Sequence, residues 1–295
     1  MQYNKITKEN IDHLLFEVAK EYHKHGKKAK GEIVIVGGAA IIANYEFRSM
    51  SEDADAIMFA ESHLKDAIVN VARKNNLPDN WLNSDFKVTR SYSDKLGKYA
   101  KDYKKYANCI EVKVIDREYL IAMKLASFRK YRNDISDIIG ILNSNYDKDM
   151  EITFEEIQKA IINLYGSYDY IEKEARQFIE NSMKEHNYRN AYDVVLKEEK
   201  MNRNIVSASK NEILNIKDIN YVLSKTKNKR LNDLYIKLGI TPTNDMHKNA
   251  TLANDLLFQT YSDNKKTIDF SQYVKTYFDD LYNLHLQYLN KEKDD

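Results

Sequence analysis

Two glycines and two aspartates near the start of the chain could together bind a phosphate and a metal ion. Gly37-Gly38 follows an apolar run and opens a segment of helical character, so its backbone N–H groups are free to hold a phosphate. Asp53 and Asp55 are separated by one residue at the start of another apolar run, where both carboxylates point to the same side of a strand. Carboxylate oxygens shared with substrate phosphates suit Mg²⁺. A lone Gly-Gly is most often a tight turn and a lone Asp-x-Asp a solvated pair, but their order and spacing favour a phosphate and metal site.

Three short apolar runs are expected to form the strands that position these residues, at 32–36, 55–59 and 109–115. The third run alternates apolar with charged residues, which is typical of a half-buried strand. Helices are expected at 7–25, from residue 39 onward, over about 61–75 and from 117 to about 130.

After about residue 150 the β signals fade and apolar spacing favours helices. These are expected at 155–164, 168–184, 189–200, 211–224, 231–238, 250–261 and 270–290. The predicted fold class is therefore α+β, with a mixed sheet flanked by helices in residues 1–148 and an all-helical domain in residues 149–295. We expect the helical domain to form the other wall of a cleft.

The motifs resemble the signature of the nucleotidyltransferase superfamily with the polymerase-β-type fold, in which a Gly-Gly or Gly-Ser turn precedes Asp-x-Asp on the next strand. More narrowly, they resemble a bacterial group related to the nucleotidyltransferase toxins of abortive-infection (type IV) toxin–antitoxin systems. The resemblance covers about residues 30–142. It rests on Gly37-Gly38-Ala39, Arg48-x-x-Ser51-x-Asp53-x-Asp55, and the segments 77–83, 116–126 and 132–138.

The resemblance implies a metal centre made of carboxylates. Asp53 and Asp55 would bind one or two Mg²⁺ or Mn²⁺ ions that bridge a triphosphate and polarise its α-phosphorus. Glu111 is the candidate for the third carboxylate, because it lies mid-strand among apolar neighbours. The alternative is that Glu111 pairs with Lys113 on a solvated face.

The resemblance also implies which residues bind the nucleotide. Gly37, Gly38 and the helix after them would cradle the β- and γ-phosphates. Arg48, Ser51 and Lys124 are further candidates for nucleotide binding, and Arg48 and Lys124 would neutralise the charge of the triphosphate. Lys124 is also a candidate catalytic residue.

Lys124 lies among apolar residues of an expected helix, so an inward-facing ammonium group needs a partner. Asp134 and Asp137 are expected either to orient Lys124 or to cap the helix that follows. The alternative for Lys124 is a solvent-facing side chain whose stem covers apolar surface.

The function that the resemblance implies is metal-dependent transfer of a nucleotidyl group from an NTP to an acceptor hydroxyl. The acceptor could be an RNA or tRNA end, a protein or a small molecule, and the protein could be a toxin of phage defence with a cognate antitoxin protein as partner. The rival hypothesis is a catalytically degenerate module that binds a nucleotide or a partner protein. A structural helical scaffold is the third alternative.

A tract rich in lysine and tyrosine could bind the acceptor. It covers 87–106, where Tyr92, Tyr99, Tyr103 and Tyr106 are interleaved with basic residues. Basic groups neutralise phosphates and aromatic rings stack on unpaired bases, which suits RNA. The alternative is a solvated helix face or an inserted loop.

The composition excludes several classes of protein. Lys and Arg number 46 and Asp and Glu number 45, so no global charge draws the chain to nucleic acid. Cys109 is the only cysteine, which rules out an intrachain disulfide. No apolar run is long enough to cross a membrane, and no signal peptide is recognisable. We therefore expect a cytoplasmic protein without membrane contact.

Overall fold

The computed structural model describes residues 3–24, 30–60 and 63–208, together with isolated positions between 219 and 252. The chain divides into two compact units, Met1–Arg203 and Asn204–Asp295. Every described strand and 3-10 turn and the first seven helices belong to the first unit, and the eighth helix begins in it. The helices predicted at 211–224, 231–238, 250–261 and 270–290 lie almost wholly outside the described residues.

A five-stranded mixed sheet forms the centre of the first unit, in the order β5-β4-β2-β7-β6. Strand β2 (Gly31–Ile35) pairs antiparallel with β4 (Ala54–Ala60) and parallel with β7 (Ile110–Ile115). On the two edges, β5 (Leu82–Asn83) runs parallel to β4 and β6 (Ala100–Tyr106) runs antiparallel to β7. A separate two-stranded ladder joins β1 (Ile6–Thr7) to β3 (Met50–Ser51). The strands predicted at 32–36, 55–59 and 109–115 are confirmed, and β6 was not predicted.

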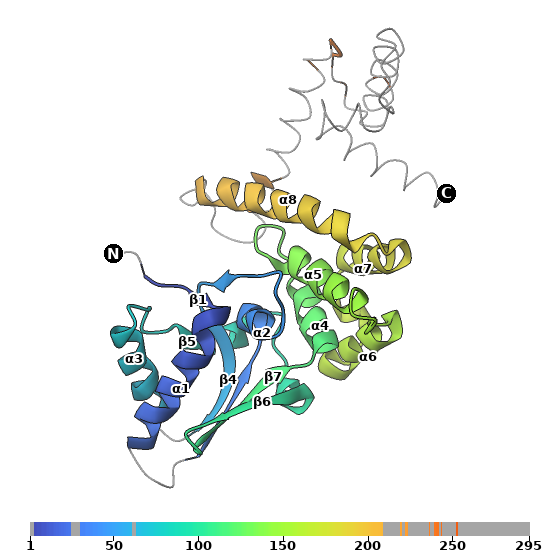
Figure 1. Cartoon of the computed structure of the whole chain (residues 1–295). Helices are drawn as coiled ribbons and strands as arrows, with labels where there is room; N and C mark the ends of the chain where they lie inside the picture. Colours follow the sequence, from blue (N-terminus) through green and yellow to red (C-terminus); the bar gives the residue numbers. More distant parts are fainter. Residues whose placement is uncertain are drawn as a thin grey trace. The chain divides into compact units, whose positions relative to one another are not determined.

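Helices flank the sheet on two sides (Figure 1). One pair, α1 (Lys8–Lys24) and α3 (Leu64–Lys74), packs together, and α2 (Gly37–Asn44) follows β2 directly. The remaining helices are α4 (Arg117–Ser127), α5 (Asp134–Tyr146), α6 (Phe154–Tyr165), α7 (Lys173–Glu185) and α8 (Tyr188–Ala208). Short 3-10 turns lie at η1 (Asp85–Val88), η2 (Leu96–Tyr99) and η3 (Tyr168–Tyr170), so the helix predicted over 168–184 is divided into η3 and α7.

The predicted fold class, α+β with a mixed sheet followed by helices, is confirmed. Helices α6 and α7 both pack against α4 within the first unit. The domain boundary expected between residues 148 and 149 stays a prediction.

Local signals explain where the helices begin and end. Helix α1 buries Ile11, Leu14 and Val18, which recur on one helical face. Helix α6 begins at a capping box in which the Thr153 hydroxyl accepts from the Glu156 N–H and the Glu156 carboxylate accepts from the Thr153 N–H. Gly166, with φ of 86°, ends α6 in the left-handed conformation that glycine adopts without strain.

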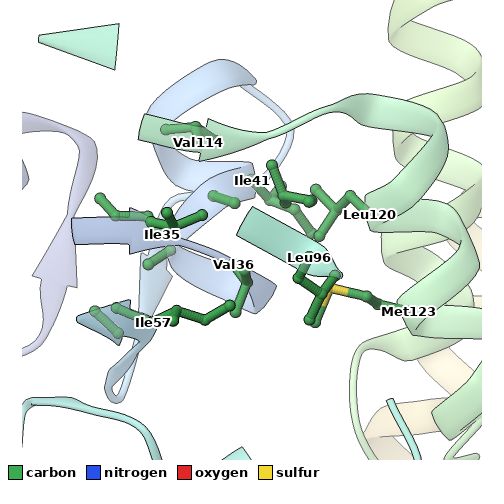
Figure 2. Close-up of a cluster of buried hydrophobic side chains, with 14 of the residues drawn as sticks. Ile35, Val36, Ile41, Ile57, Leu96, Val114, Leu120 and Met123 are labelled. Atoms are coloured by element: carbon green, nitrogen blue, oxygen red, sulfur yellow. The ribbon is translucent and has the colours of Figure 1, made fainter. Parts of the chain in front are cut away.

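The apolar core joins the sheet to α2 and α4 (Figure 2). Ile35 ends β2, Val36 follows it, and Val114 lies on the neighbouring strand β7. All three side chains are buried. Leu96 of η2 and Met123 of α4 pack into the same cluster. This packing holds the start of α2 and the body of α4 against one end of the sheet.

Candidate functional site

The turn that begins α2 lies directly against Asp55. The backbone N–H of Val36 donates to the Asp55 carbonyl at 2.9 Å, so the end of β2 is tied to the start of β4. Gly37 has φ of 60°, and a Cβ there would stand 2.9 Å from Asp55 Oδ2. Both the backbone conformation and this close approach therefore require glycine. No side chain caps α2 at Val36, which leaves the N–H groups of its first turn available to an anion.

The second glycine brings Arg48 and Ser51 to the same turn. A Cβ at Gly38 would lie 2.8 Å from both Arg48 Nη2 and Ser51 Oγ. The Arg48 side chain also donates from Nε to the Met50 carbonyl at 3.2 Å, which fixes the guanidinium beside the turn. The structure thus brings together Gly37, Gly38, Arg48, Ser51 and Asp55, as expected from the sequence.

The two aspartates of the Asp-x-Asp motif differ in environment. Asp53 is exposed, whereas Asp55 is half-buried. Burial, and then the charge of Asp53, raises the pKa of Asp55 to about 6, although Lys124 and Arg129 act in the opposite direction. Two carboxylates that repel each other in this way fit a divalent cation, because the cation relieves the repulsion.

Asp85, in the first position of η1, is a further carboxylate that acts on Asp55. Its charge adds to the rise in the pKa of Asp55. Asp85 follows β5, whose residue Asn83 pairs with Asp55 in the sheet, and the Asp85 N–H donates to Asn83 Oδ1 at 2.7 Å. Sequence reasoning missed Asp85, because a two-residue edge strand has no apolar pattern that would reveal it.

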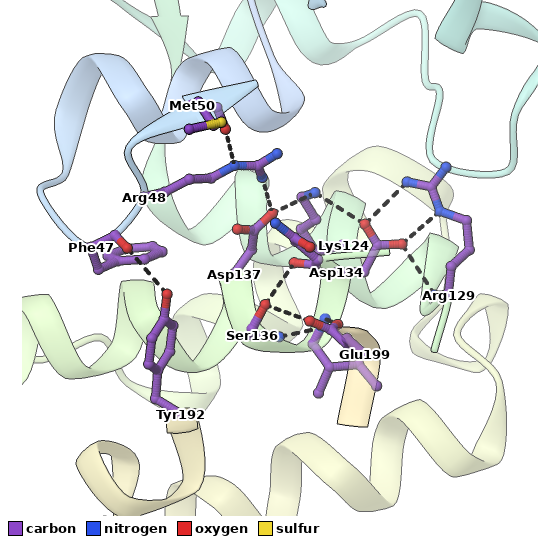
Figure 3. A network of polar contacts seen from close by, with 12 residues as sticks. Phe47, Arg48, Met50, Lys124, Arg129, Asp134, Ser136, Asp137, Tyr192 and Glu199 are labelled. Atoms are coloured by element: carbon purple, nitrogen blue, oxygen red, sulfur yellow. Dashed lines mark hydrogen bonds and ion pairs between the residues drawn. The ribbon is translucent and has the colours of Figure 1, made fainter. Parts of the chain in front are cut away.

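A buried ion network includes Arg48, which lies against the glycine turn that begins α2 (Figure 3). Lys124, which is 8% exposed, places Nζ 3.0 Å from Asp134 Oδ1 and 2.8 Å from Asp137 Oδ2. Arg48 Nη1 lies 2.6 Å from Asp137 Oδ2, and Arg129 Nε lies 2.7 Å from Asp134 Oδ2. We call these five residues the buried ion network. Orientation of Lys124 by the two aspartates was one of the two arrangements that the sequence suggested.

The electrostatics keep the network charged. Burial opposes the charge of Lys124, yet Asp137 and Asp134 hold the pKa of the ammonium group above its usual value. Burial likewise acts to raise the pKa of Asp134, but Lys124 and Arg129 hold it far below its usual range. Three cations therefore face two carboxylates, and the excess positive charge acts on Asp55, since Lys124 and Arg129 both lower its pKa.

Glu111 is not brought to this site, which corrects the expectation that it supplies the third carboxylate. On β2, Glu32 pairs with Glu111 of β7, whereas Val36, four residues later, bonds to Asp55. At ~3.3 Å per residue, Glu111 is displaced along the sheet from Asp55 by about 13 Å. Its carboxylate is exposed and forms an ion pair with Lys105 at 2.8 Å.

Glu111 instead lines an open pocket at the far end of the sheet, with Lys30 and Phe59, of about 370 Å³. The expected alternative partner, Lys113, pairs with Glu32 at 2.6 Å. Within residues 3–24, 30–60 and 63–208 and the few described positions beyond them, no group of three or more His, Cys, Asp or Glu side chains could hold a metal ion. The described side chains alone therefore do not make a complete metal site, and a metal ion here would need further ligands such as substrate phosphates.

The tyrosines of the basic tract 87–106 are engaged inside the fold. Tyr99 stacks on Tyr119 with ring centroids 4.1 Å apart, and Tyr92 contacts Phe86 edge-on. The hydroxyls of Tyr103 and Tyr106 both donate to Asp12, at 2.9 and 2.7 Å. These contacts use the four rings within the fold, and the segment 96–106 forms η2 and β6 rather than the helix face or inserted loop of the alternative. Three lysines of the tract, Lys101, Lys104 and Lys105, form ion pairs with Asp116, Asp12 and Glu111.

The only cysteine, Cys109, is buried, and a buried thiol of this kind packs as a small apolar residue. Among the described helices, none combines the length and the apolar character that a membrane span requires.

A comparison with protein families agrees with the geometry of the site. The model of a family described as "Nucleotidyltransferase of unknown function (DUF6036)" matches residues 13–162, about half of the chain. No curated protein and no solved structure matches. The matched range contains the glycine turn, Asp53, Asp55 and the whole buried ion network. The chain therefore belongs to the DUF6036 family of nucleotidyltransferases.

Proposed function

We propose that this nucleotidyltransferase transfers a nucleotidyl group from an NTP to an acceptor hydroxyl with the help of Mg²⁺ or Mn²⁺. The observation that carries the proposal is the juxtaposition, at one end of the sheet, of the Asp53–Asp55 pair, the uncapped start of α2 and a cation cluster with excess positive charge. The acceptor oxygen bonds to the α-phosphorus while the bond to the β-phosphate oxygen breaks, and pyrophosphate and one proton leave. Catalysis of this step depends on positioning and on stabilising negative charge.

The residues of the chain divide this work between them. Asp53 and Asp55 would hold the metal ion, which when bound would supply Lewis-acid chemistry to the phosphates. The N–H groups at the start of α2 would hold terminal phosphate oxygens, because the N-cap residue Val36 makes no side-chain hydrogen bond to them. Arg129 is the network cation with the most exposed side chain, 39%, so it can contact the phosphates directly, with Lys124 behind it.

The acceptor and the biological role belong to the same proposal. We infer an RNA or tRNA end as acceptor and a role as a toxin of an abortive-infection (type IV) toxin–antitoxin system, paired with an antitoxin protein. Support comes from the resemblance carried by Arg48-x-x-Ser51-x-Asp53-x-Asp55 and by the segment 116–126. Induced expression in bacteria should then arrest growth with the wild type and not with a variant that lacks both aspartates.

A second candidate is a nucleotide-binding module without catalysis. The observation that favours it is the displacement of Glu111 from Asp55, since no three His, Cys, Asp or Glu side chains among the described residues form a group that could hold a metal ion.

One experiment separates the two candidates. Purified protein is incubated with each α-³²P-labelled NTP, Mg²⁺ and total bacterial RNA, next to an Asp53→Ala/Asp55→Ala variant. Glu52→Ala is the matched control, because Glu52 is an exposed carboxylate next to Asp53, between β3 and β4. Label that enters RNA or protein with the wild type and the control, and not with the double variant, supports the transferase. Mg²⁺-dependent NTP binding without transfer supports the binding module, and absence of binding refutes both.

A further inference from the structure

Helix α8 lies beyond the range matched by the family, yet it inserts a carboxylate next to the buried ion network (Figure 3). Glu199 is only 1% exposed. Its Oε1 accepts from the backbone N–H of Ile135 at 2.8 Å and of Ser136 at 3.3 Å, and its Oε2 accepts from the Ser136 hydroxyl at 2.5 Å. Asn133 provides no side-chain cap for α5, so Glu199 caps this helix from another part of the chain.

The turn that Glu199 caps carries both aspartates of the buried ion network. Asp134 begins α5 and Asp137 lies one turn later. Because these two carboxylates hold Lys124, Arg129 and Arg48, the position of the first turn of α5 determines where the cations point.

Two more contacts of α8 reach the segments that carry these cations. The Tyr192 hydroxyl donates to the carbonyl of Phe47, the residue before Arg48, at 3.2 Å, and the two rings meet edge-on with centroids 5.7 Å apart. Asn202 Nδ2 donates to the Lys130 carbonyl, directly after Arg129, at 2.8 Å. Helix α8 is thus hydrogen-bonded to the backbone of the residues adjacent to Arg48 and Arg129.

Packing alone gives no reason for a carboxylate at this position. Burial, opposed by the hydrogen bonds from Ser136 and Ile135 and assisted by the charge of Asp137, raises the pKa of Glu199 to about 7. An apolar side chain would avoid this desolvation, but it could not accept from the two N–H groups and the hydroxyl. The group therefore serves the geometry of the turn.

We propose that Glu199 is a positioning residue for nucleotide binding: it fixes the first turn of α5 so that Asp134 and Asp137 hold Lys124, Arg129 and Arg48 in place for the phosphates of an NTP. This inference rests on the proposed function. It extends the functional unit past residue 162, where the family match ends, to α8.

The test compares Glu199→Ala and Glu199→Gln in the full chain, with Glu198→Ala as the control, because Glu198 is the exposed neighbour on the same helix. The probes are the Mg²⁺ complexes of ATP, GTP, CTP and UTP, whose dissociation constants are measured at a temperature where circular dichroism shows each variant to be folded. We expect Glu199→Ala to weaken binding about tenfold, the loss that follows when one charged hydrogen bond to phosphate is misplaced.

Glutamine should restore binding to within about twofold of the wild type, because its oxygen can accept from both N–H groups while its amide donates to the Ser136 hydroxyl. Glu198→Ala should bind as the wild type does. If Glu199→Ala lowers only the melting temperature and leaves every dissociation constant unchanged, the role of Glu199 is structural and the inference is wrong. A wild type that binds none of the four nucleotides refutes the proposed function itself, and the inference with it.

Discussion

Replacing Asp134 by asparagine should destabilise the first unit severely, because the substitution removes a negative charge from between two cations. Asp134 is fully buried, and its two oxygens accept from Lys124 Nζ, from Arg129 Nε and Nη2, and from the Arg129 backbone N–H. An asparagine keeps one oxygen and turns an NH₂ group toward one of these donors.

The magnitude follows from what remains unpaired. Removing one partner of a buried ion pair costs about 3–5 kcal/mol, because the other charge stays in a medium of low dielectric constant. A protein of this kind is stable by about 5–15 kcal/mol in total, so the variant loses a large share of its stability. With a urea m-value of about 2 kcal/mol/M, the unfolding midpoint should fall by about 2 M.

The assay uses the single tryptophan of the chain. Trp81 is fully buried in the first unit and donates from Nε1 to the Ile68 carbonyl at 3.2 Å, so its fluorescence in urea reports the unfolding of this unit. Asp193→Asn is the matched control, since Asp193 is exposed, and should move the midpoint by no more than about 0.25 M, because exposed substitutions change stability by less than ~0.5 kcal/mol.

A second variant tests the cause of the loss. Lys124→Met should also destabilise the protein, but the double variant with Asp134→Asn should cost clearly less than the two single changes added, because neither partner is then left alone. The charged form of Asp134 stabilises the fold above its usual pKa, and this contribution is lost as the pH falls, since its pKa in the folded state is lowered. A shift of less than about 0.5 M for Asp134→Asn, or strict additivity of the two changes, would refute the ion network as the source of stability.

Three further changes test other parts of the site. Gly140→Ala places a Cβ in steric clash with the edge of the Phe47 ring and should lower stability by about 1–3 kcal/mol in the same fluorescence titration; an unchanged midpoint would contradict this packing. Because burial and Asp53 raise the pKa of Asp55 to about 6, Mn²⁺ affinity should rise between about pH 5 and 7 and Asp55→Asn should abolish the rise. Glu199, with its pKa raised to about 7, makes the fold less stable as the pH rises from 4.5 toward 7; Glu199→Gln should flatten that decline, and an identical decline in both proteins would contradict it.

How far the sequence predicts the fold depends on burial. The strands β2, β4 and β7 are central, so their apolar runs are visible without any structure. Strand β6 escaped prediction because it is an edge strand whose residues 101, 102, 104 and 105 are all charged and exposed. Its backbone pairs with β7, and such a strand needs little apolar surface of its own.

The residues of the candidate site also differ in whether the sequence predicts them. Gly37 and Asp55 were predicted together from the order and spacing of their motifs and from the family resemblance, and the hydrogen bond from Val36 to Asp55 places them side by side. Glu111 was misplaced because alternation identifies a strand and its faces, whereas only the register shows which end of the strand faces the site. Glu199 was missed because 63 residues separate it from Ser136, and no local pattern predicts which helix end a distant carboxylate will cap.

Charge balance explains why the two halves of this site belong together. Burial and then the charge of Asp53 raise the pKa of Asp55, so a cation beside the pair would offset its negative charge. The buried ion network has the opposite excess, because Arg48, Lys124 and Arg129 face two carboxylates. A metal ion alone would be attracted by the Asp53–Asp55 pair and repelled by the buried ion network. A free triphosphate would be attracted by the network and repelled by the two aspartates. In the proposed function, a metal–triphosphate complex carries both a cation and a surplus of negative charge, so it would satisfy both halves at once.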